Sequence, residues 1–557
     1  MWQRCLPYIS LAVAVFAVYS NIYGNVFLFD DDLLIRLNTY LRSWDTFRHL
    51  LTASTTEGAH IAGGFYRPLQ NLLYFFIFQI GGEQPFGFHL LNVALHAANA
   101  CLGYRLALKL GLDPRAALAG MLIWAVHPLH TEAVTYMSGT ADPLFVFFGL
   151  WSLNVLMPEP STKRIWQSLP LFVLALLSKE TAVVFPALAV VCLYFSAVGS
   201  GNVGHSRFEA RGPGKNPRTP NLEPRGTWLL LKTVFATWPL WLTAMVYLAW
   251  RVSSSDFDGP TRYTHLFGMP EYATMKLYAE NPLLRFTTFL ATLPAYAQLL
   301  LWPVDLHMER SFPLQDDWLS SRVLGGLVML LAAAAEIVWA RRGAGLAVAW
   351  GLLWFGAAHA PNTGLLFPMN SLFLEHWMYL PTIGLCLGLA EVAVTLLDRY
   401  KIHALNAASL AVALAAGGAL AAHAYDQNTI WHDPVVFYTN IFSYGVVSPR
   451  AHNNLAIAYM DRHDLPKAIE EYRRAIREGD TYAETHYNLA LALLAMSDQK
   501  PQLTQAIAEL ERSLEIEPRF YRSFATLAQI YLRLGEPAKA ETYRRKAEEA
   551  LAGMGAQ

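Results

Sequence analysis

The chain has 557 residues, of which 54% are apolar and only 15% are charged, and its formal net charge is −1. Soluble domains carry about a quarter charged residues, so this composition argues against a soluble globular protein and predicts one that crosses a membrane many times. A net charge near zero gives no electrostatic case for nucleic acid as a partner. The four cysteines form no CxxC pair, which argues against a disulfide framework or a zinc knuckle.

The first apolar segment, near residues 6–24, is followed by three consecutive carboxylates, Asp30, Asp31 and Asp32. Only one basic residue, Arg4, precedes the segment, and no small-x-small cleavage site follows it. We therefore interpret it as a retained membrane helix rather than a signal peptide. Three adjacent negative charges at the end of such a helix resist burial and need an explanation.

Apolar segments continue to about residue 424, and we predict a membrane domain over residues 1–425. A spanning helix needs about 20 apolar residues, and shorter segments are tolerated where their flanks compensate. On this basis we predict about eleven transmembrane helices, near 6–24, 86–109, 114–130, 137–157, 164–178, 181–198, 228–250, 323–340, 345–358, 374–397 and 404–424.

Lysine and arginine placement predicts the orientation, because these residues gather in cytoplasmic turns. With Arg4 inside, all basic turns are cytoplasmic only if the apolar segment 284–302 does not cross, and we predict an interfacial or re-entrant helix there. The N-terminus is then cytoplasmic and the C-terminal domain extracytoplasmic. The basic turns hold Arg105, Lys109 and Arg115, then Lys163 and Arg164, then the loop 199–227 with five basic residues, then Arg341 and Arg342, and last Arg399 and Lys401.

The C-terminal part has a different texture, with frequent charges and helical periodicity. We predict a connector over 426–447 and three tetratricopeptide repeats over 448–553, an α-solenoid that binds a protein partner on its concave face. The third copy repeats the small and aromatic residues of the first at the same offsets. The repeat positions are Leu455, Ala456, Tyr459, Ala468, Tyr472 and Ala475, then Leu489, Ala490, Ala506 and Pro518, then Leu527, Ala528, Tyr531, Ala540 and Ala547.

The predicted topology brings most unusual polar residues of the membrane domain to the outer loops, and ionisable groups near a bilayer are costly enough to point to function. Each also has a structural reading: solvated carboxylates at 30–32, a local ion pair at Lys179 and Glu180, and capping side chains at His127 and His130. The HxxHxE spacing up to Glu132 resembles a metal site, but no closed ligand set is visible. The stripe His89, Asn92 and His96 favours polar packing between helices.

Seven motifs in order, "FLFDDDLLIRLN", "YRPL", "FHLLNVALH", "HPLHTEAV", "SGTADPL", "LLSKET" and "EHWMYLP", resemble the transmembrane-and-tetratricopeptide O-mannosyltransferases, a pattern shared by bacterial relatives. The resemblance covers essentially the whole chain. This chain has Thr140 where the family usually has Arg, and Glu375-His376 where it usually has Glu-Arg, so two basic contacts of the family are missing or replaced. The short repeat array leads us to expect a bacterial member, in the inner membrane.

The resemblance implies a GT-C type fold and inverting transfer of a sugar, mannose-like, from a polyprenyl-phosphate donor to a hydroxyl, commonly of Ser or Thr of a protein, outside the cytoplasm. A hydroxyl needs a carboxylate to accept its proton, and a phosphate leaving group needs cations. By motif matching, Asp30 and Asp31 are the catalytic pair, one the base and one its positioner, while Asp32 is solvated. The remaining candidates are Arg67, His130 and Lys179 for the donor phosphate, and His127, Glu132, Asp142, Glu180 and Glu375 for the sugar or for holding those cations.

The lipid-linked donor, the surrounding lipids and an acceptor protein held by the repeats are the expected partners, and no cofactor or metal is assigned. Three alternatives remain at this stage. The first is a membrane-anchored repeat scaffold for an envelope or secretion assembly, although a scaffold needs only one or two helices. The second is a transporter or flippase, which would place charges at the membrane midplane. The third is the same enzyme class acting on a lipid or glycan acceptor.

Overall fold

The computed structural model describes residues 2–59, 65–203, 223–253, 276–340, 343–369, 371–400, 406–479, 482–497 and 499–554. The chain forms two compact units. Unit 1 comprises Met1–Asp258, Pro282–Met308 and Phe312–His432, and unit 2 comprises Gly259–Asn281, Glu309–Ser311 and Asp433–Gln557. Every regular element within the described ranges is helical, so the predicted all-α class is confirmed.

A helix lies at each of the eleven predicted spans, and the span at 228–250 consists of two helices that meet at an angle of 61°. The segment 284–302, predicted not to cross, is also a helix. In chain order the long helices of unit 1 are α1 (Trp2–Val18), α3 (Pro68–Gly81), α4 (Pro85–Lys109), α5 (Pro114–Val126), α7 (Ala141–Leu156), α8 (Thr162–Leu176), α9 (Phe185–Val203), α10 (Glu223–Ala236), α11 (Trp238–Ser253), α14 (Pro282–Leu301), α15 (Ser321–Trp339), α16 (Gly343–His359), α17 (Pro381–Arg399) and α18 (Asn406–Ile430).

Four helical segments in the described part of the chain are long and apolar enough to cross a membrane by themselves: Met137–Leu156, Glu180–Val198, Ser321–Trp339 and Pro381–Arg399. The bent pair Trp228–Ala236 and Trp238–Ser253 adds a fifth if it is one span. The chain is therefore a membrane protein, while the count of eleven stays a prediction. Of the basic residues that set the predicted orientation, those at 204–222, Arg341, Arg342 and Lys401 lie outside the described residues.

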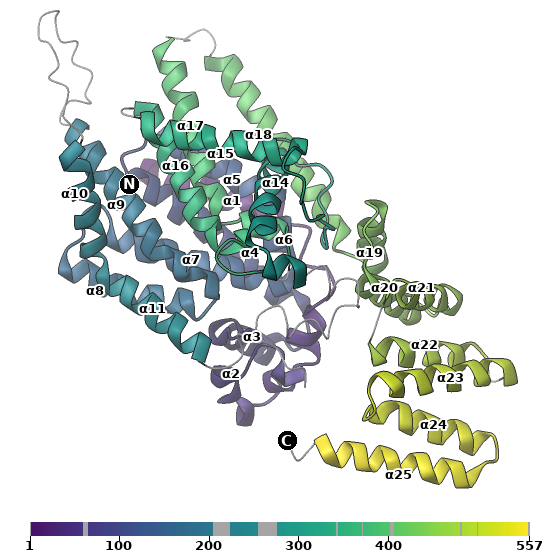
Figure 1. Ribbon diagram of the computed structural model, residues 1–557. Coiled ribbons are helices and arrows are strands. Elements are labelled where there is room, and N and C mark those ends of the chain that lie inside the picture. Colours follow the sequence, from purple (N-terminus) through teal and green to yellow (C-terminus); the bar gives the residue numbers. More distant parts are fainter. Residues whose placement is uncertain are drawn as a thin grey trace, which may run out of the picture. The chain divides into compact units, whose positions relative to one another are not determined.

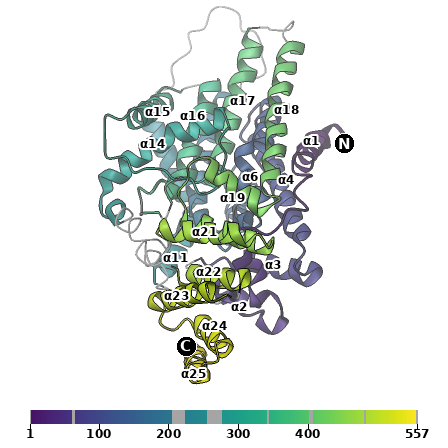
Figure 2. The same ribbon diagram turned by 90° about the vertical axis from the view of Figure 1, so that its right-hand side faces the viewer.

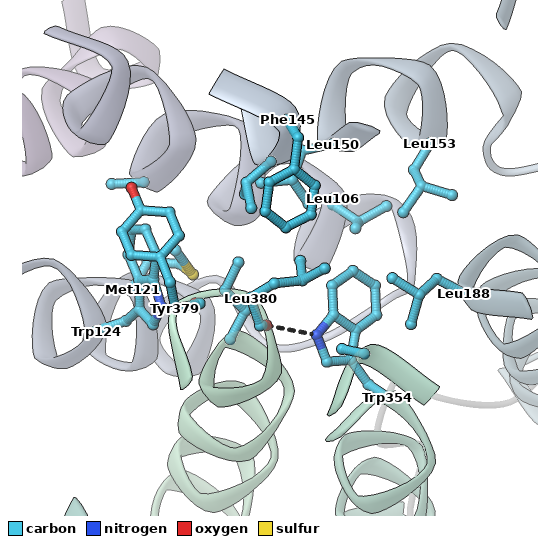
Figure 3. Packing of buried hydrophobic residues seen from close by; sticks show 14 of the residues in the cluster. Leu106, Met121, Trp124, Phe145, Leu150, Leu153, Leu188, Trp354, Tyr379 and Leu380 are labelled. Atoms are coloured by element: carbon cyan, nitrogen blue, oxygen red, sulfur yellow. Dashed lines mark hydrogen bonds between the residues drawn. The ribbon is translucent and has the colours of Figure 1, made fainter. Parts of the chain in front are cut away.

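The core of unit 1 is built around α4, α5 and α17 (Figure 1). Glycine allows the closest helix contacts: a Cβ at Gly120 of α5 would lie 2.8 Å from the Cys386 carbonyl oxygen of α17. At the start of α17 the carbonyl of Leu380 accepts a hydrogen bond of 2.9 Å from the Trp354 indole, as Figure 3 shows. The Trp124 indole donates in the same way to the Tyr379 carbonyl, at 3.0 Å. Close packing and satisfied backbone groups together fix α5 and α16 against the start of α17.

Unit 2 is a run of paired helices, drawn in green to yellow in Figures 1 and 2. The predicted repeat residues form its core: Ala456, Ala468, Leu489, Ala506 and Leu527 are all buried. Small residues at these positions let the paired helices approach closely, so the repeat architecture is confirmed. The domain boundaries stay a prediction. The helices are α19 (Pro434–Ser443), α20 (Pro449–Asp461), α21 (Leu465–Arg477), α22 (Ala483–Met496), α23 (Lys500–Ile516), α24 (Tyr521–Arg533) and α25 (Pro537–Met554).

Candidate active site

The three aspartates lie in the loop between α1 and α3 and have three different environments. Asp31 is 1% exposed, Asp30 is half-buried, and Asp32 pairs with Arg36 on the surface at 2.9 Å. Directly before them, Phe29 has a φ of +57°, a left-handed conformation that is costly for a bulky side chain and frequent at functional sites. The environment of Asp32 agrees with the prediction that it is solvated.

Both carboxylate oxygens of Asp31 accept hydrogen bonds. Oδ2 accepts from the backbone N–H of Leu28 at 2.9 Å, and Oδ1 accepts from both the N–H and the hydroxyl of Ser138, at 2.7 and 2.5 Å. Burial raises the pKa of Asp31 to about 7, and the bonds from Ser138 and Leu28 oppose that rise. Asp31 is therefore a carboxyl group that changes charge near neutral pH.

Asp30 is fixed through its backbone. Its N–H donates to the hydroxyl of Tyr136 at 2.9 Å. The pKa of Tyr136 lies well above its ordinary value because of burial and, after that, the charges of Asp30 and Asp31. The segment that contains Tyr136 and Ser138 thus holds both aspartates of the predicted pair.

That segment runs between α5 and α7 as short helical turns, namely η5 (Pro128–His130), α6 (Thr131–Thr135) and η6 (Met137–Thr140). Asn92 of α4 donates to the carbonyls of Val134 and Tyr136, at 3.2 and 3.0 Å. The His89 ring bonds the carbonyl of Asn25, in the aspartate loop, at 3.3 Å. The prediction that this polar stripe of α4 packs polar to polar is confirmed, and the stripe positions both loops.

Arg67 lies directly before α3, at its N-cap position, and pairs with Glu180, with its Nη2 2.9 Å from Oε1 and its Nε 3.3 Å from Oε2. The guanidinium also lies over the Phe65 ring, 4.6 Å from the centroid. Burial works to lower the pKa of Arg67, but Glu180 and then Asp142 hold it above its ordinary value. A planar guanidinium held in this way suits a phosphate as well as a carboxylate.

Lys179 and Asp142 form the most deeply buried ion pair described in unit 1. The Nζ–Oδ1 distance is 2.7 Å, and each side chain is 8% exposed. Glu180, next to Lys179 in the sequence, binds Arg67. The two adjacent residues therefore take part in two ion pairs of opposite sense, Lys179 with a carboxylate and Glu180 with a guanidinium. The structural alternative for Lys179 and Glu180, a local ion pair, is wrong, because each of these residues pairs with a distant partner instead.

The aspartate loop and the ion pairs are connected through α3. Gln70 donates to the carbonyl of Ser138 at 3.2 Å and to the hydroxyl of Tyr74 at 2.8 Å. Burial is the main reason that the pKa of Tyr74 is raised, and the charges of Asp31 and Arg67 both act on it. One neighbourhood is therefore built from the loop between α1 and α3, the start of α7 and the turn before α9, and it contains Asp30, Asp31, Arg67, Lys179, Asp142 and Glu180.

The other predicted site residues lie in a second neighbourhood. His127 bonds the Leu300 carbonyl at 2.9 Å and accepts from the N–H of Leu129 at 3.2 Å, which is a capping role. His130 is buried against Trp124 and Tyr379, and its Nδ1 has no hydrogen-bond partner. None of its contacts is with the two cations of the first neighbourhood.

Glu132 binds His376, with Oε1 2.7 Å from Nδ1 and Oε2 accepting from the backbone N–H at 3.0 Å. Burial works to raise the pKa of Glu132, but His376 holds it below the ordinary value. Glu375 accepts a hydrogen bond of 2.9 Å from the N–H of His307. No group of three His, Cys, Asp or Glu side chains placed to hold a metal occurs in the described ranges, and the HxxHxE residues point to separate partners.

Three residues of the first neighbourhood are absent from the sequence-based set. Tyr136 and Ser138 are uncharged, and only the position of Ser138 within the "SGTAD" motif marks it. Arg251 is buried at the end of α11, 5.9 Å from the ring centroids of both Tyr66 and Trp250. The charges of Arg251, Glu180 and Arg67 all interact with the Tyr247 side chain, so Arg251 belongs to the same neighbourhood as the other two. Arg251 thus adds a further, buried cation to this neighbourhood.

No family model matches the chain. Over 97% of its length it is 23% identical to protein O-mannosyl-transferase TMTC3 of Mus musculus, and the match covers 63% of that protein. Over 85% of its length it is 24% identical to protein O-mannosyl-transferase Tmtc1 of Drosophila melanogaster, and this match covers 62% of that protein. The predicted resemblance is confirmed. The chain spans less than two thirds of the length of these curated relatives.

Among solved structures, the chain is similar to the crystal structure of ArnT from Cupriavidus metallidurans bound to undecaprenyl phosphate. The TM-score is 0.33 at 11% identity, over 98% of this chain and 76% of that one.

Proposed function

We propose that the chain is an inverting glycosyltransferase that moves a sugar from a polyprenyl-phosphate donor to a hydroxyl group. The observation that carries the proposal is the pairing of a strained, partly buried aspartate loop with two cation–carboxylate pairs, one buried and one half-buried. A proton acceptor and phosphate-binding cations are the two elements that such a transfer needs. The names of the curated relatives support mannose as the sugar and a protein as the acceptor.

The environments of the two aspartates support different roles. Asp31 uses both oxygens in three hydrogen bonds and is almost inaccessible, which suits a positioner. Asp30 is only half-buried, which suits the base. In the proposed step the acceptor oxygen attacks the anomeric carbon, the bond from that carbon to the phosphate oxygen breaks, and Asp30 accepts the hydroxyl proton. Attack opposite to the leaving phosphate inverts the anomeric centre.

Arg67 and Lys179 are the proposed phosphate ligands, with Arg251 as a further cation. Both bind carboxylates in the structure, so a donor phosphate would share or replace Glu180 and Asp142 as the partner. This exchange keeps each buried cation paired throughout, which avoids the cost of an isolated buried charge. His130 fits this role less well, because it packs against aromatic rings and its polar contact is with the hydroxyl of Thr382. Glu132 and Glu375 are proposed to hold the loop segments rather than the sugar.

The proposed location of the site is the extracytoplasmic face, in the inner membrane of a bacterium, with the N-terminus in the cytoplasm. The distribution of lysine and arginine supports this orientation. A polyprenyl chain remains in lipid while its phosphate and sugar reach water, which also favours an interfacial site. The repeats over 448–553 are proposed to hold the acceptor protein and so raise its local concentration.

The test replaces Asp30 and Asp31 by Asn, separately and together, with Asp32→Asn as the matched control. Asp32 belongs to the same loop but pairs with Arg36 on the surface. After membrane insertion has been confirmed for each variant, the masses of the glycans on envelope proteins are compared. The double variant is expected to lose the modification and the control to keep it. Unchanged glycans in the double variant would refute the proposed function.

A second experiment separates catalysis from acceptor capture. Deletion of residues 448–557 is expected to abolish transfer to protein while hydrolysis of the lipid-linked donor continues. Retained transfer to protein in the deletion variant would show that the repeats have another role, and would leave the proposed chemistry in place.

A further inference from the structure

Ser138 supplies two of the three hydrogen bonds that the buried Asp31 carboxylate accepts. Its backbone N–H and its hydroxyl both reach Oδ1, at 2.7 and 2.5 Å, across 107 residues of sequence. The third donor, the N–H of Leu28, belongs to the same loop as the aspartate. The hydroxyl of Ser138 is thus the only side-chain group seen to donate to Asp31 in the part of the chain that the structure describes.

We propose that Ser138 is a positioning residue, which keeps the Asp31 carboxylate ionised and fixed so that Asp30 can act as the base. This inference rests on the proposed function. Hydrogen bonds to the charged form of a buried acid favour that form, and here they oppose the effect of burial. A negative charge on Asp31 in turn raises the proton affinity of its neighbour Asp30, which makes Asp30 the stronger base.

The other ionisable groups that face Asp31 come from three elements. Asp30 belongs to the same loop and opposes ionisation of Asp31 through its charge. Tyr136 belongs to the segment before η6, and Tyr74 belongs to α3. Burial keeps the pKa of both phenols above the ordinary value, so both stay neutral at the pH values of interest. The positive charge of Arg67 lowers the pKa of Tyr74, but burial outweighs this effect. Ser138 is therefore the nearest group that favours the charged form of Asp31.

The test is the pH profile of kcat for sugar transfer by the full chain in detergent micelles, with a polyprenyl-phosphate sugar as donor and a Ser/Thr peptide as acceptor. A hydrogen bond to a charged group is worth about one to two pKa units. Since Asp31 titrates near pH 7, Ser138→Ala should move the acidic limb of the profile up by that amount. At pH 7 the expected loss of kcat is about 5- to 50-fold, with the KM for the donor nearly unchanged.

Two further variants make the result specific. Ser138→Thr keeps the hydroxyl and should return the acidic limb to the wild-type position. Ser152→Ala is the matched control: Ser152 is also buried in unit 1, but its hydroxyl donates to the neutral carbonyl of Ser168 at 2.9 Å. It should leave the acidic limb where it is. An unmoved limb in Ser138→Ala, an equal shift in Ser152→Ala, or a shift that Ser138→Thr fails to reverse would each overturn the proposal.

A measurement that does not depend on activity distinguishes failure of this inference from failure of the proposed function. Thermal unfolding at pH 9 is compared for Ser138→Ala in the wild-type and in the Asp31→Asn background. The cost of the Ser138→Ala change should be present with Asp31 and largely absent with Asn. Coupling without sugar transfer by the wild type would refute the proposed function. Transfer without coupling would refute only the role of Ser138.

Discussion

The buried ion pair of Lys179 and Asp142 gives a quantitative test of the site. Each side chain is 8% exposed and the two charged atoms are 2.7 Å apart. Removal of one partner leaves the other buried without compensation, which costs about 3–5 kcal/mol. Replacement of both by apolar residues of similar size is close to neutral. Lys179→Met and Asp142→Leu should therefore each lower the free energy of unfolding strongly, while the double variant recovers most of the loss.

The coupling energy of the pair follows from these values and should reach about 3 kcal/mol or more. The matched control is the exposed pair of Asp32 and Arg36, four residues apart, with side chains 42% and 50% exposed. Pairs of this kind are worth about 0.3–0.5 kcal/mol. The assay is the free energy of unfolding in mixed micelles that contain increasing amounts of denaturing detergent. A coupling energy below about 1 kcal/mol for the buried pair would refute the reasoning.

The same double variant also separates structure from function. It should fold, yet it lacks the cation that we propose for the donor phosphate. The KM for the polyprenyl-phosphate donor should rise at least about tenfold, because a charge-assisted hydrogen bond is worth about 1.5 kcal/mol or more. A stable double variant with the wild-type KM would show that Lys179 has a structural role alone.

Two further predictions concern Glu132 and the contact between α14 and α15. His376 holds the pKa of Glu132 below the ordinary 4.5. The stabilisation that ionised Glu132 contributes is therefore complete above about pH 4.5 and is lost as the pH falls through the lowered pKa. Glu132→Gln should remove this acid sensitivity. The pH dependence of the unfolding midpoint checks this, and identical curves would contradict it. Gly326→Ala places a Cβ 1.9 Å from the Leu290 carbonyl oxygen and should destabilise the α14–α15 contact by about 1–3 kcal/mol. Gly325→Ala, 3.9 Å from its nearest neighbour, should be tolerated, and equal effects would contradict the steric argument.

The sequence predicts those features that depend on local pattern. The repeats are predicted correctly because small residues at fixed offsets, such as Ala456 and Ala490, are needed wherever two helices pack closely. Helices are predicted where apolar segments occur, because backbone groups in lipid require internal hydrogen bonds. The resemblance of the loop motifs is likewise local, and it selects the aspartates as candidates before any geometry is known.

Pairings between distant segments are the features that the sequence does not predict. Lys179 and Glu180 are adjacent and of opposite charge, which favours a local ion pair, but the chain turns so that each binds a residue more than 30 positions away. Ser138 contacts Asp31 across 107 residues and carries no charge to draw attention. His130 has the spacing of a metal ligand, yet its surroundings are aromatic rings. Such contacts depend on the tertiary arrangement of whole loops.

The polar residues inside unit 1 divide into two classes by what they bind. Asn92 and His89 of α4 bind backbone carbonyls of the aspartate loop and of the segment between α5 and α7, and buried carbonyls need such hydrogen-bond partners. Their polarity is thus required by the loops and does not by itself indicate chemistry. Asp31 is different, because it is an acid that accepts hydrogen bonds with both carboxylate oxygens. Burying its negative charge costs free energy. Stability by itself would favour a neutral side chain here, so a buried acid at this position is best explained by function.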